Sequence, residues 1–212
     1  MISGLVRSKV LLKGTDGMRT AEIVRKTGET DIQVKFSADG DGTAKLATGI
    51  GFFDHMLHLF TKHGLFQSEI VCKGDLNVDG HHTVEDIGIA LGQAVLKSLG
   101  DKAGIKRYGT AFVPMDEALA MVSLDISGRS FLVYDVEQVL TPMIGDYDTE
   151  LTEEFLRAFA MQAGITLHVK VLHGKNSHHI VEAIFKALGR ALGEAVTKDA
   201  RIQGVMSTKG ML

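Results

Sequence analysis

A five-residue motif occurs twice in this chain, and the repetition constrains the fold more than any other feature of the sequence. The first copy is His81-His82-Thr83-Val84-Glu85, and the second copy, 97 residues later, is His178-His179-Ile180-Val181-Glu182. Four of the five positions are identical. Apolar residues at helical spacing follow each copy, so both motifs are predicted to open a helix. The simplest fold with two matched helices of this kind is a duplicated one.

The motif combines two consecutive histidines with a carboxylate, which is a combination suited to binding metal. On a helix Glu85 lies four residues after His81 and three after His82, so either pair can share one face. The two histidines are offset by about 100° around the helix axis, so they do not easily face one ion together. This favours one site with two ions, or two sites. The alternative, two exposed helix starts with incidental histidines, is weakened because the motif recurs in matched surroundings.

The residues around the two motifs repeat the same order of predicted elements. In the first half, Asp54 is predicted to cap a helix that ends at Gly64, and the motif helix ends near Gly100. The predicted strands of this half span 21–26, 31–36 and 66–72. In the second half, the predicted strands span 107–113, 119–126, 130–136 and 165–172, and the predicted helices span 152–163 and 178–196.

The two halves can be aligned residue by residue. Placing His55 on Glu154 also places Phe60 on Phe159. Each half is predicted to be an α+β unit with helices on one face of a mixed sheet, and two units side by side would bring the two motif helices together. The predicted division is an N-terminal extension at 1–18, a first half-repeat at 19–100, and a second half-repeat with a C-terminal tail at 101–212, the two repeats forming one catalytic domain.

Composition and charge exclude some classes of function. A formal net charge of -3 gives no sign of a nucleic-acid or membrane partner, and no apolar run reaches the roughly 18–20 residues that span a bilayer. The N-terminus lacks a good signal peptide. The single cysteine, Cys72, cannot form an internal disulfide and is interpreted as a small buried hydrophobe. These features predict a cytoplasmic protein.

Two groups of polar residues are candidates for chemistry. Imidazole with carboxylate suits Mn, Fe, Zn or Ni more than Ca or Mg, and six-coordinate Mn fits mixed nitrogen and oxygen donors. The candidate ligands are His55, His81, His82, Glu85, Glu154, His178, His179 and Glu182. Hydroxyl, Lys and Arg side chains placed in turns supply the donors that a phosphate monoester needs. These candidates are Arg107, Arg129 and the C-terminal stretch Ser207-Thr208-Lys209-Gly210.

Taken together, these motifs resemble one family, the imidazoleglycerol-phosphate dehydratases of histidine biosynthesis. The resemblance covers the chain from about residue 19 to the end, and the number, order and spacing of the motifs make it specific. The matching stretches are Arg19-Thr20-Ala21-Glu22, Thr27-Gly28-Glu29-Thr30-Asp31-Ile32, Gly51-Phe52-Phe53-Asp54-His55-Met56-Leu57, Asp79-Gly80-His81-His82-Thr83-Val84-Glu85-Asp86, Asp125-Ile126-Ser127-Gly128-Arg129, His178-His179-Ile180-Val181-Glu182-Ala183 and Ser207-Thr208-Lys209-Gly210.

The resemblance implies a fold, an activity and an assembly. The fold would be a duplicated half-domain related to the second domain of ribosomal protein S5. The enzyme would dehydrate D-erythro-imidazole glycerol phosphate to imidazole acetol phosphate with two Mn2+ per subunit. It would assemble from trimers into a 24-subunit homo-oligomer whose sites lie between subunits.

By motif match, the eight candidate ligands would bind the metal. One departure concerns Glu154, because many members of the family have His there; a carboxylate also binds Mn. The substrate would contact Glu29, His55, His63, Arg107, Arg129, Ser207, Thr208 and Lys209.

The implied chemistry accounts for this set of residues. The proton to be removed lies on a carbon that is not adjacent to a carbonyl, so it is weakly acidic. Metal on the imidazole nitrogen favours an imidazolate, which expels the hydroxyl through a diazafulvene-like intermediate. A carboxylate then moves the remaining proton. Glu29 is the first candidate for this role, and Glu85 and Glu182 are the other candidate catalytic carboxylates.

Two other interpretations remain open from the sequence. A dinuclear metal hydrolase acting on a phosphate ester would use the same metal and phosphate donors. An RNA-binding module is the alternative from another class, because the predicted half-domain resembles that of S5. The acidic net charge and the lack of a basic stripe interleaved with aromatic residues oppose it.

Overall fold

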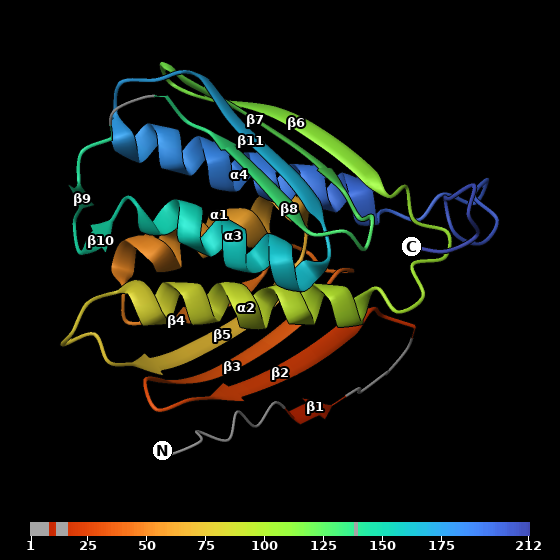
Figure 1. The fold of residues 1–212 in the computed structure, drawn as a ribbon, viewed down its shortest axis with the longest axis horizontal. Coiled ribbons are helices and arrows are strands. Elements are labelled where there is room, and N and C mark those ends of the chain that lie inside the picture. The colour runs from red at the N-terminus through yellow and green to blue at the C-terminus, as the bar shows by residue number, and fades with distance from the viewer. Residues whose placement is uncertain (1–8, 12–16, 138–139) are drawn as a thin grey trace.

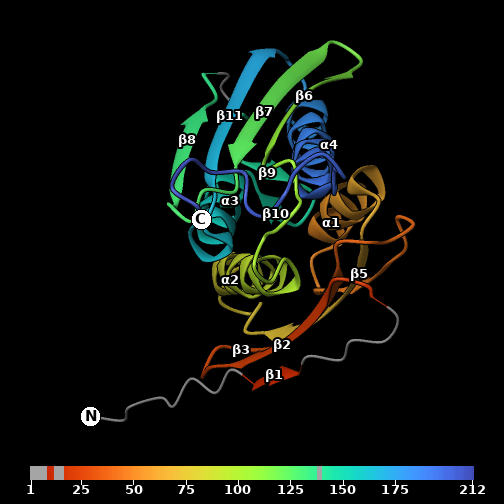
Figure 2. The same cartoon turned by 90° about the vertical axis from the view of Figure 1, so that its right-hand side faces the viewer.

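Two β-sheets enclose a layer of four helices in the described part of the chain (Figures 1 and 2). The computed structural model describes residues 9–11, 17–137 and 140–212. The helices are α1 (Gly51–Gly64), α2 (His81–Ser98), α3 (Leu151–Ala163) and α4 (Ser177–Val196).

The first sheet has the strand order β1-β2-β3-β5-β4 and the second has the order β6-β7-β11-β8. The strands of the first sheet are β1 (Lys9–Leu11), β2 (Thr20–Lys26), β3 (Thr30–Ser37), β4 (Ala44–Ala47) and β5 (Gln67–Gly74). The strands of the second are β6 (Tyr108–Met115), β7 (Ala118–Asp125), β8 (Phe131–Asp135) and β11 (Thr166–His173). A separate two-stranded ribbon joins β9 (Met143–Ile144) to β10 (Tyr147–Asp148).

Alternation along the strands explains why each sheet has one buried face. In β7, Ala118, Ala120, Val122 and Leu124 are buried while the residues between them are partly exposed. This period of two directs apolar side chains to a single face. Helices α2 and α4 cover the buried faces of the first and second sheet respectively. The prediction of an α+β fold, with helices on one face of each mixed sheet, is confirmed.

The two halves repeat the same arrangement of elements. In each half an antiparallel pair, β2–β3 or β6–β7, is followed by a strand that lies parallel to the half's last strand. These parallel pairs are β4 with β5 and β8 with β11. The structure also adds β1 to the edge of the first sheet, within the segment predicted to be an N-terminal extension; residues 1–8 and 12–16 lie outside the described residues. The predicted boundaries at 18, 100 and 212 remain predictions.

The two motif helices were predicted to lie together, but they do not pack against each other. Helix α2 packs against α3, and α4 packs against α1, so each motif helix contacts the first helix of the other half. A Cβ at Gly92 of α2 would lie 2.6 Å from the carbonyl oxygen of Phe159, and one at Gly189 of α4 would lie 2.4 Å from that of Phe60. Glycine is therefore what lets these backbones approach. The two contacts are equivalent under the predicted alignment of Phe60 with Phe159.

One predicted helix start is also wrong. Helix α1 begins at Gly51, so Asp54 lies in its first turn and does not cap it. The Asp54 carboxylate instead accepts a hydrogen bond of 3.0 Å from the backbone N–H of Thr48 in the preceding loop. The backbone N–H of Asp54 donates to the carbonyl oxygen of Ile50 at 2.9 Å, which is already a helical hydrogen bond. Among the described residues, no helix is long and apolar enough to cross a membrane.

Candidate active site

The second motif and helix α1 form the tightest group of candidate ligands. Nε2 of His178 lies 3.2 Å from Oε2 of Glu182, and Nε2 of His55 lies 3.4 Å from the same oxygen. The ligand atoms of the three residues lie within 4.8 Å of one another. The spacing of four residues places His178 and Glu182 on one face of α4, as predicted. Packing of α1 on α4 brings in His55 from the other half.

Glu182 is buried in this group and forms an ion pair with Lys186, a residue that was not among the predicted site residues. Nζ of Lys186 lies 2.6 Å from Oε1 of Glu182, which leaves Oε2 for the two imidazoles. Burial alone would raise the pKa of Glu182, but the Lys186 ammonium, with His55 and His178, holds that pKa below its ordinary value. The signal in the sequence was the spacing of four residues between Glu182 and Lys186 on a predicted helix.

The first motif has an equivalent but looser group. His81 Nε2 lies 3.9 Å from Oε2 of Glu85. Glu154 of α3 lines a cavity of about 460 Å³ together with His81, Glu150 and Glu153. Glu154 and His81 therefore face the same cavity, just as His55 and His178 lie in one group. The two arrangements correspond because α3 packs on α2 in the way that α1 packs on α4. The carboxylate-rich surroundings make this end of the molecule strongly negative.

The second histidine of each motif faces a different set of groups. Nδ1 of His82 contacts Asp75, and the hydrogen bond to this carboxylate raises the pKa of His82. Nδ1 of His179 lies 2.7 Å from Glu117, which raises the pKa of His179 and lowers that of Glu117 to about 2. Glu29, the candidate proton carrier, lies 3.7 Å from Nε2 of His82. The two histidines of each motif thus face different groups, and that they do not bind one ion together stays a prediction.

The residues proposed to hold a phosphate lie near the C-terminal tail. Arg107 is buried and donates to both carboxylate oxygens of Asp125, at 2.6 and 3.0 Å, and to the carbonyl oxygen of Met206 at 2.7 Å. Arg129 is exposed, with its Nη2 3.9 Å from Asp125. Lys209 donates its backbone N–H to Oγ of Ser207. Arg107 therefore ties the tail to the second sheet, and Arg129 has the freer guanidinium.

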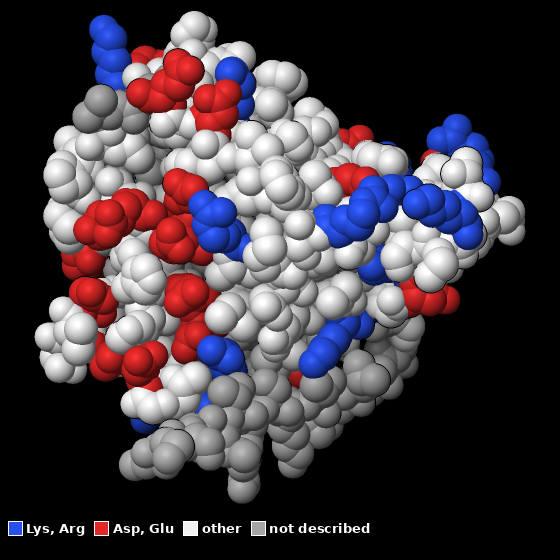
Figure 3. Space-filling view, in the orientation of Figure 1, with Lys and Arg blue, Asp and Glu red and all other residues white. Residues whose placement is uncertain are grey.

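Within one chain the metal and phosphate candidates lie at opposite ends. The N–H of Arg107 donates to the carbonyl oxygen of Ala195, which follows His178 by 17 residues on α4. At 1.5 Å per residue this is roughly 25 Å along the helix axis. Both motif helices start at the left of Figure 1, whereas the C-terminus lies at the right. Acidic side chains gather at the left end of the surface and basic ones toward the right (Figure 3).

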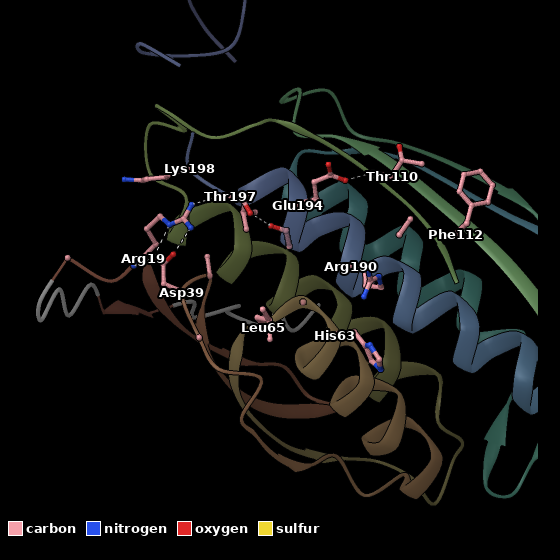
Figure 4. A pocket seen from close by; sticks show the side chains of 17 residues that line it. Arg19, Asp39, His63, Leu65, Thr110, Phe112, Arg190, Glu194, Thr197 and Lys198 are labelled. Atoms are coloured by element: carbon pink, nitrogen blue, oxygen red, sulfur yellow. Dashed lines mark hydrogen bonds and ion pairs between the residues drawn. The ribbon is translucent and has the colours of Figure 1, made fainter. Parts of the chain in front are cut away.

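His63 lies away from both ligand groups, at the end of α1. Burial, reinforced by the positive charges of Lys186 and Arg190, lowers the pKa of His63. His63 and Arg190 line a cavity of about 1140 Å³, whose far side is formed by Arg19 and Asp39 (Figure 4). None of the eight candidate metal ligands lines this cavity.

Comparisons with known proteins by family profile and by sequence point to the same family. The family profile described as imidazoleglycerol-phosphate dehydratase matches residues 48–192. The imidazoleglycerol-phosphate dehydratase of Acetivibrio thermocellus is 61% identical over 194 residues, which are 92% of this chain and 99% of the relative. That of Thermoanaerobacter pseudethanolicus is 63% identical over 195 residues, which are 92% and 100% of the two chains.

Solved structures of the same enzyme superpose on this chain. The Staphylococcus aureus imidazoleglycerol-phosphate dehydratase gives a TM-score of 0.73 at 44% identity, covering 80% of this chain and 95% of that one. The Pyrococcus furiosus enzyme, solved in complex with (S)-C348, gives a TM-score of 0.76 at 37% identity, covering 89% and 99%.

Proposed function

Because the chain belongs to the imidazoleglycerol-phosphate dehydratase family and is a hydro-lyase of histidine biosynthesis, we propose that its two motif helices hold the metal for this reaction. The observation that carries the proposal is the group formed by His55, His178 and Glu182 across the two halves. The family membership does not favour the phosphoester hydrolase or the RNA-binding module. The product is imidazole acetol phosphate.

The donor set fits manganese. Two imidazoles and one carboxylate converge in the group of His178, and an imidazole with two carboxylates surrounds the start of α2. Mixed nitrogen and oxygen donors of this kind suit Mn2+. We assign one ion to each group, giving two per subunit. We propose that His82 and His179 complete the eight ligands by binding ions shared with neighbouring copies, since each is offset by about 100° from the first histidine of its motif.

The chain's own residues perform the binding and proton transfer. When bound, the metal supplies Lewis-acid stabilisation and a template for the imidazole ring. Glu29, on the turn between β2 and β3, is exposed beside His82 and serves as the general acid or base for the substrate carbon. Glu85 and Glu182 supply negative charge to the metal sites. The phosphate is held by charge-assisted hydrogen bonds from Arg107, Arg129, Ser207, Thr208 and Lys209.

The separation of these groups supports a site built from more than one copy. A small substrate cannot reach from the start of α4 to Arg107, roughly 25 Å away along the helix. The negative end of one copy and the positive end of another are complementary (Figure 3). We propose that the chain assembles through trimers into a 24-subunit particle in which these ends meet.

The proposed activity is tested with purified protein and imidazole glycerol phosphate. We expect dehydration to the acetol phosphate without release of inorganic phosphate, together with about two Mn2+ per chain by the ligand assignment above. Removing the metal with a chelator should abolish the reaction, and adding Mn2+ should restore it. Release of inorganic phosphate as the main product would instead identify a hydrolase.

Metal is also expected to join neighbouring copies. Binding free energy available only in the assembled state favours that state by mass action. Titration with EDTA, followed by light scattering, should therefore convert a large particle into a smaller one, with activity lost in parallel. Mn2+ at neutral pH should restore both. A metal-free protein that keeps the full particle mass would show that metal serves the chemistry alone.

A further inference from the structure

The second histidine of each motif contacts a carboxylate that lies outside the predicted ligands. Nδ1 of His82 lies 3.0 and 3.2 Å from the two carboxylate oxygens of Asp75. Nδ1 of His179 lies 2.7 Å from Oε2 of Glu117. An ionised carboxylate only accepts hydrogen bonds, so the neutral imidazole carries its proton on Nδ1. The Nε2 atom of each ring is then left with a lone pair.

The two carboxylates come from different segments of the two halves. Asp75 follows β5, whereas Glu117 lies in the turn between β6 and β7. The turn of the first half that corresponds to this second turn carries Glu29, which approaches Nε2 of His82 and not Nδ1. In a duplicated chain we would expect the same segment of each half to supply the carboxylate that contacts the second histidine. The same contact built from two unrelated segments indicates that the contact itself is required.

Backbone hydrogen bonds hold the carboxylate of Glu117 and the main chain of Asp75 in place. Oε1 of Glu117 accepts from the N–H groups of Lys175 and Asn176, at 3.1 and 2.8 Å. The Asn176 side chain in turn caps α4 by accepting from the N–H groups of its motif histidines. The backbone N–H of Asp75 donates to the carbonyl oxygen of Glu29 at 3.1 Å. The turn at 175–176 thus fixes the Glu117 carboxylate beside His179, and the turn that carries Glu29 fixes the main chain from which Asp75 reaches His82.

We propose that Asp75 and Glu117 are positioning residues that hold the imidazoles of His82 and His179 in the tautomer and orientation needed to bind metal through Nε2. The inference rests on the proposed metal sites. A carboxylate on the far nitrogen fixes the ring and raises its basicity as a ligand, and losing such a contact typically costs about 10- to 100-fold in metal affinity.

The test uses Mn2+ alone, titrated into metal-stripped full-length protein by calorimetry. Asp75→Asn and Glu117→Gln keep the side-chain shape but remove the charge, and each should weaken Mn2+ binding by about 10- to 100-fold. Glu69→Gln is the matched control, since among the described residues Glu69 forms its ion pair with Lys35, on the outer face of the first sheet. It should bind Mn2+ like the unmodified protein. The thermal midpoints of all metal-free variants should stay close together.

Several outcomes distinguish the alternatives. Unchanged Mn2+ affinity in both amide variants would overturn the proposal, including the case in which only their thermal midpoints fall. The charge-retaining variants Asp75→Glu and Glu117→Asp should lose less affinity than the amides, and they serve if an amide variant does not fold; an equal loss in both pairs opposes the proposal. If the unmodified protein binds no Mn2+, the proposed metal sites fail, and this inference falls with them.

Discussion

His178→Ala is expected to reduce dehydratase activity by on the order of 100-fold or more and to remove one of the bound ions. The substitution takes one imidazole from the group in which His55 and His178 meet the same oxygen of Glu182. Lys186 remains 2.6 Å from the other oxygen of Glu182, so the carboxylate is left paired with an ammonium. The remaining two donors do not hold the ion against competition from water.

Metal content by mass spectrometry and steady-state kinetics measure this effect. His58→Ala is the matched control, because His58 is an exposed residue of α1 that belongs to neither ligand group. It should keep full metal content and turnover. A His178→Ala protein with two ions and normal turnover would remove this residue from the active site.

Gly189→Leu is expected to prevent stable folding, and Gly189→Ala to destabilise the protein by about 1–3 kcal/mol. A Cβ at this position would lie 2.4 Å from the carbonyl oxygen of Phe60, so α1 and α4 would have to separate. Gly92 makes the equivalent contact with Phe159, and Gly92→Ala should have a similar effect. Separating α1 from α4 would also move His55 away from His178 and Glu182, and separating α2 from α3 would move His81 away from Glu154.

Urea denaturation of the metal-free protein measures these stabilities without a contribution from bound ions. Gly51→Ala provides the control, because a Cβ at Gly51 meets nothing within 4 Å and the residue lies at the start of α1. Its unfolding free energy should change little. If Gly189→Ala unfolds at the same urea concentration as this control, close helix packing is not what requires glycine.

Much of the fold was determined by local sequence patterns. The longer strands of both sheets, of five to eight residues, and the two motif helices lie close to their predicted ranges, because the spacing of apolar residues reports which face of each element is buried. The short strands β1, β4, β9 and β10 were missed, since two to four residues are too few for a period to be visible. The duplication was readable because both motifs lie at helix starts in matched surroundings.

The site was only partly determined in this way. Spacing along one helix placed His178 beside Glu182, because residues four apart share a face. The same spacing could have identified Lys186 as a neighbour of Glu182, but nothing in the sequence identified Asp75 or Glu117 as neighbours of the motif. Asp75 and Glu117 come from a loop and a hairpin turn, whose positions depend on how the strands pair.

Tertiary structure alone decided which helices meet. The sequence marked two equivalent motif helices, but the close backbone contacts at Gly92 and Gly189 join each to the first helix of the other half. Backbone approach depends on the three-dimensional fit of two surfaces, which periodicity along one segment does not encode. The same packing places the candidate metal ligands at one end of the molecule and Arg107 at the other, because α4 runs from His178 to Ala195, where Arg107 is bonded. The sequence determined the chemical groups, and the packing of the helices determined how far apart one chain holds them.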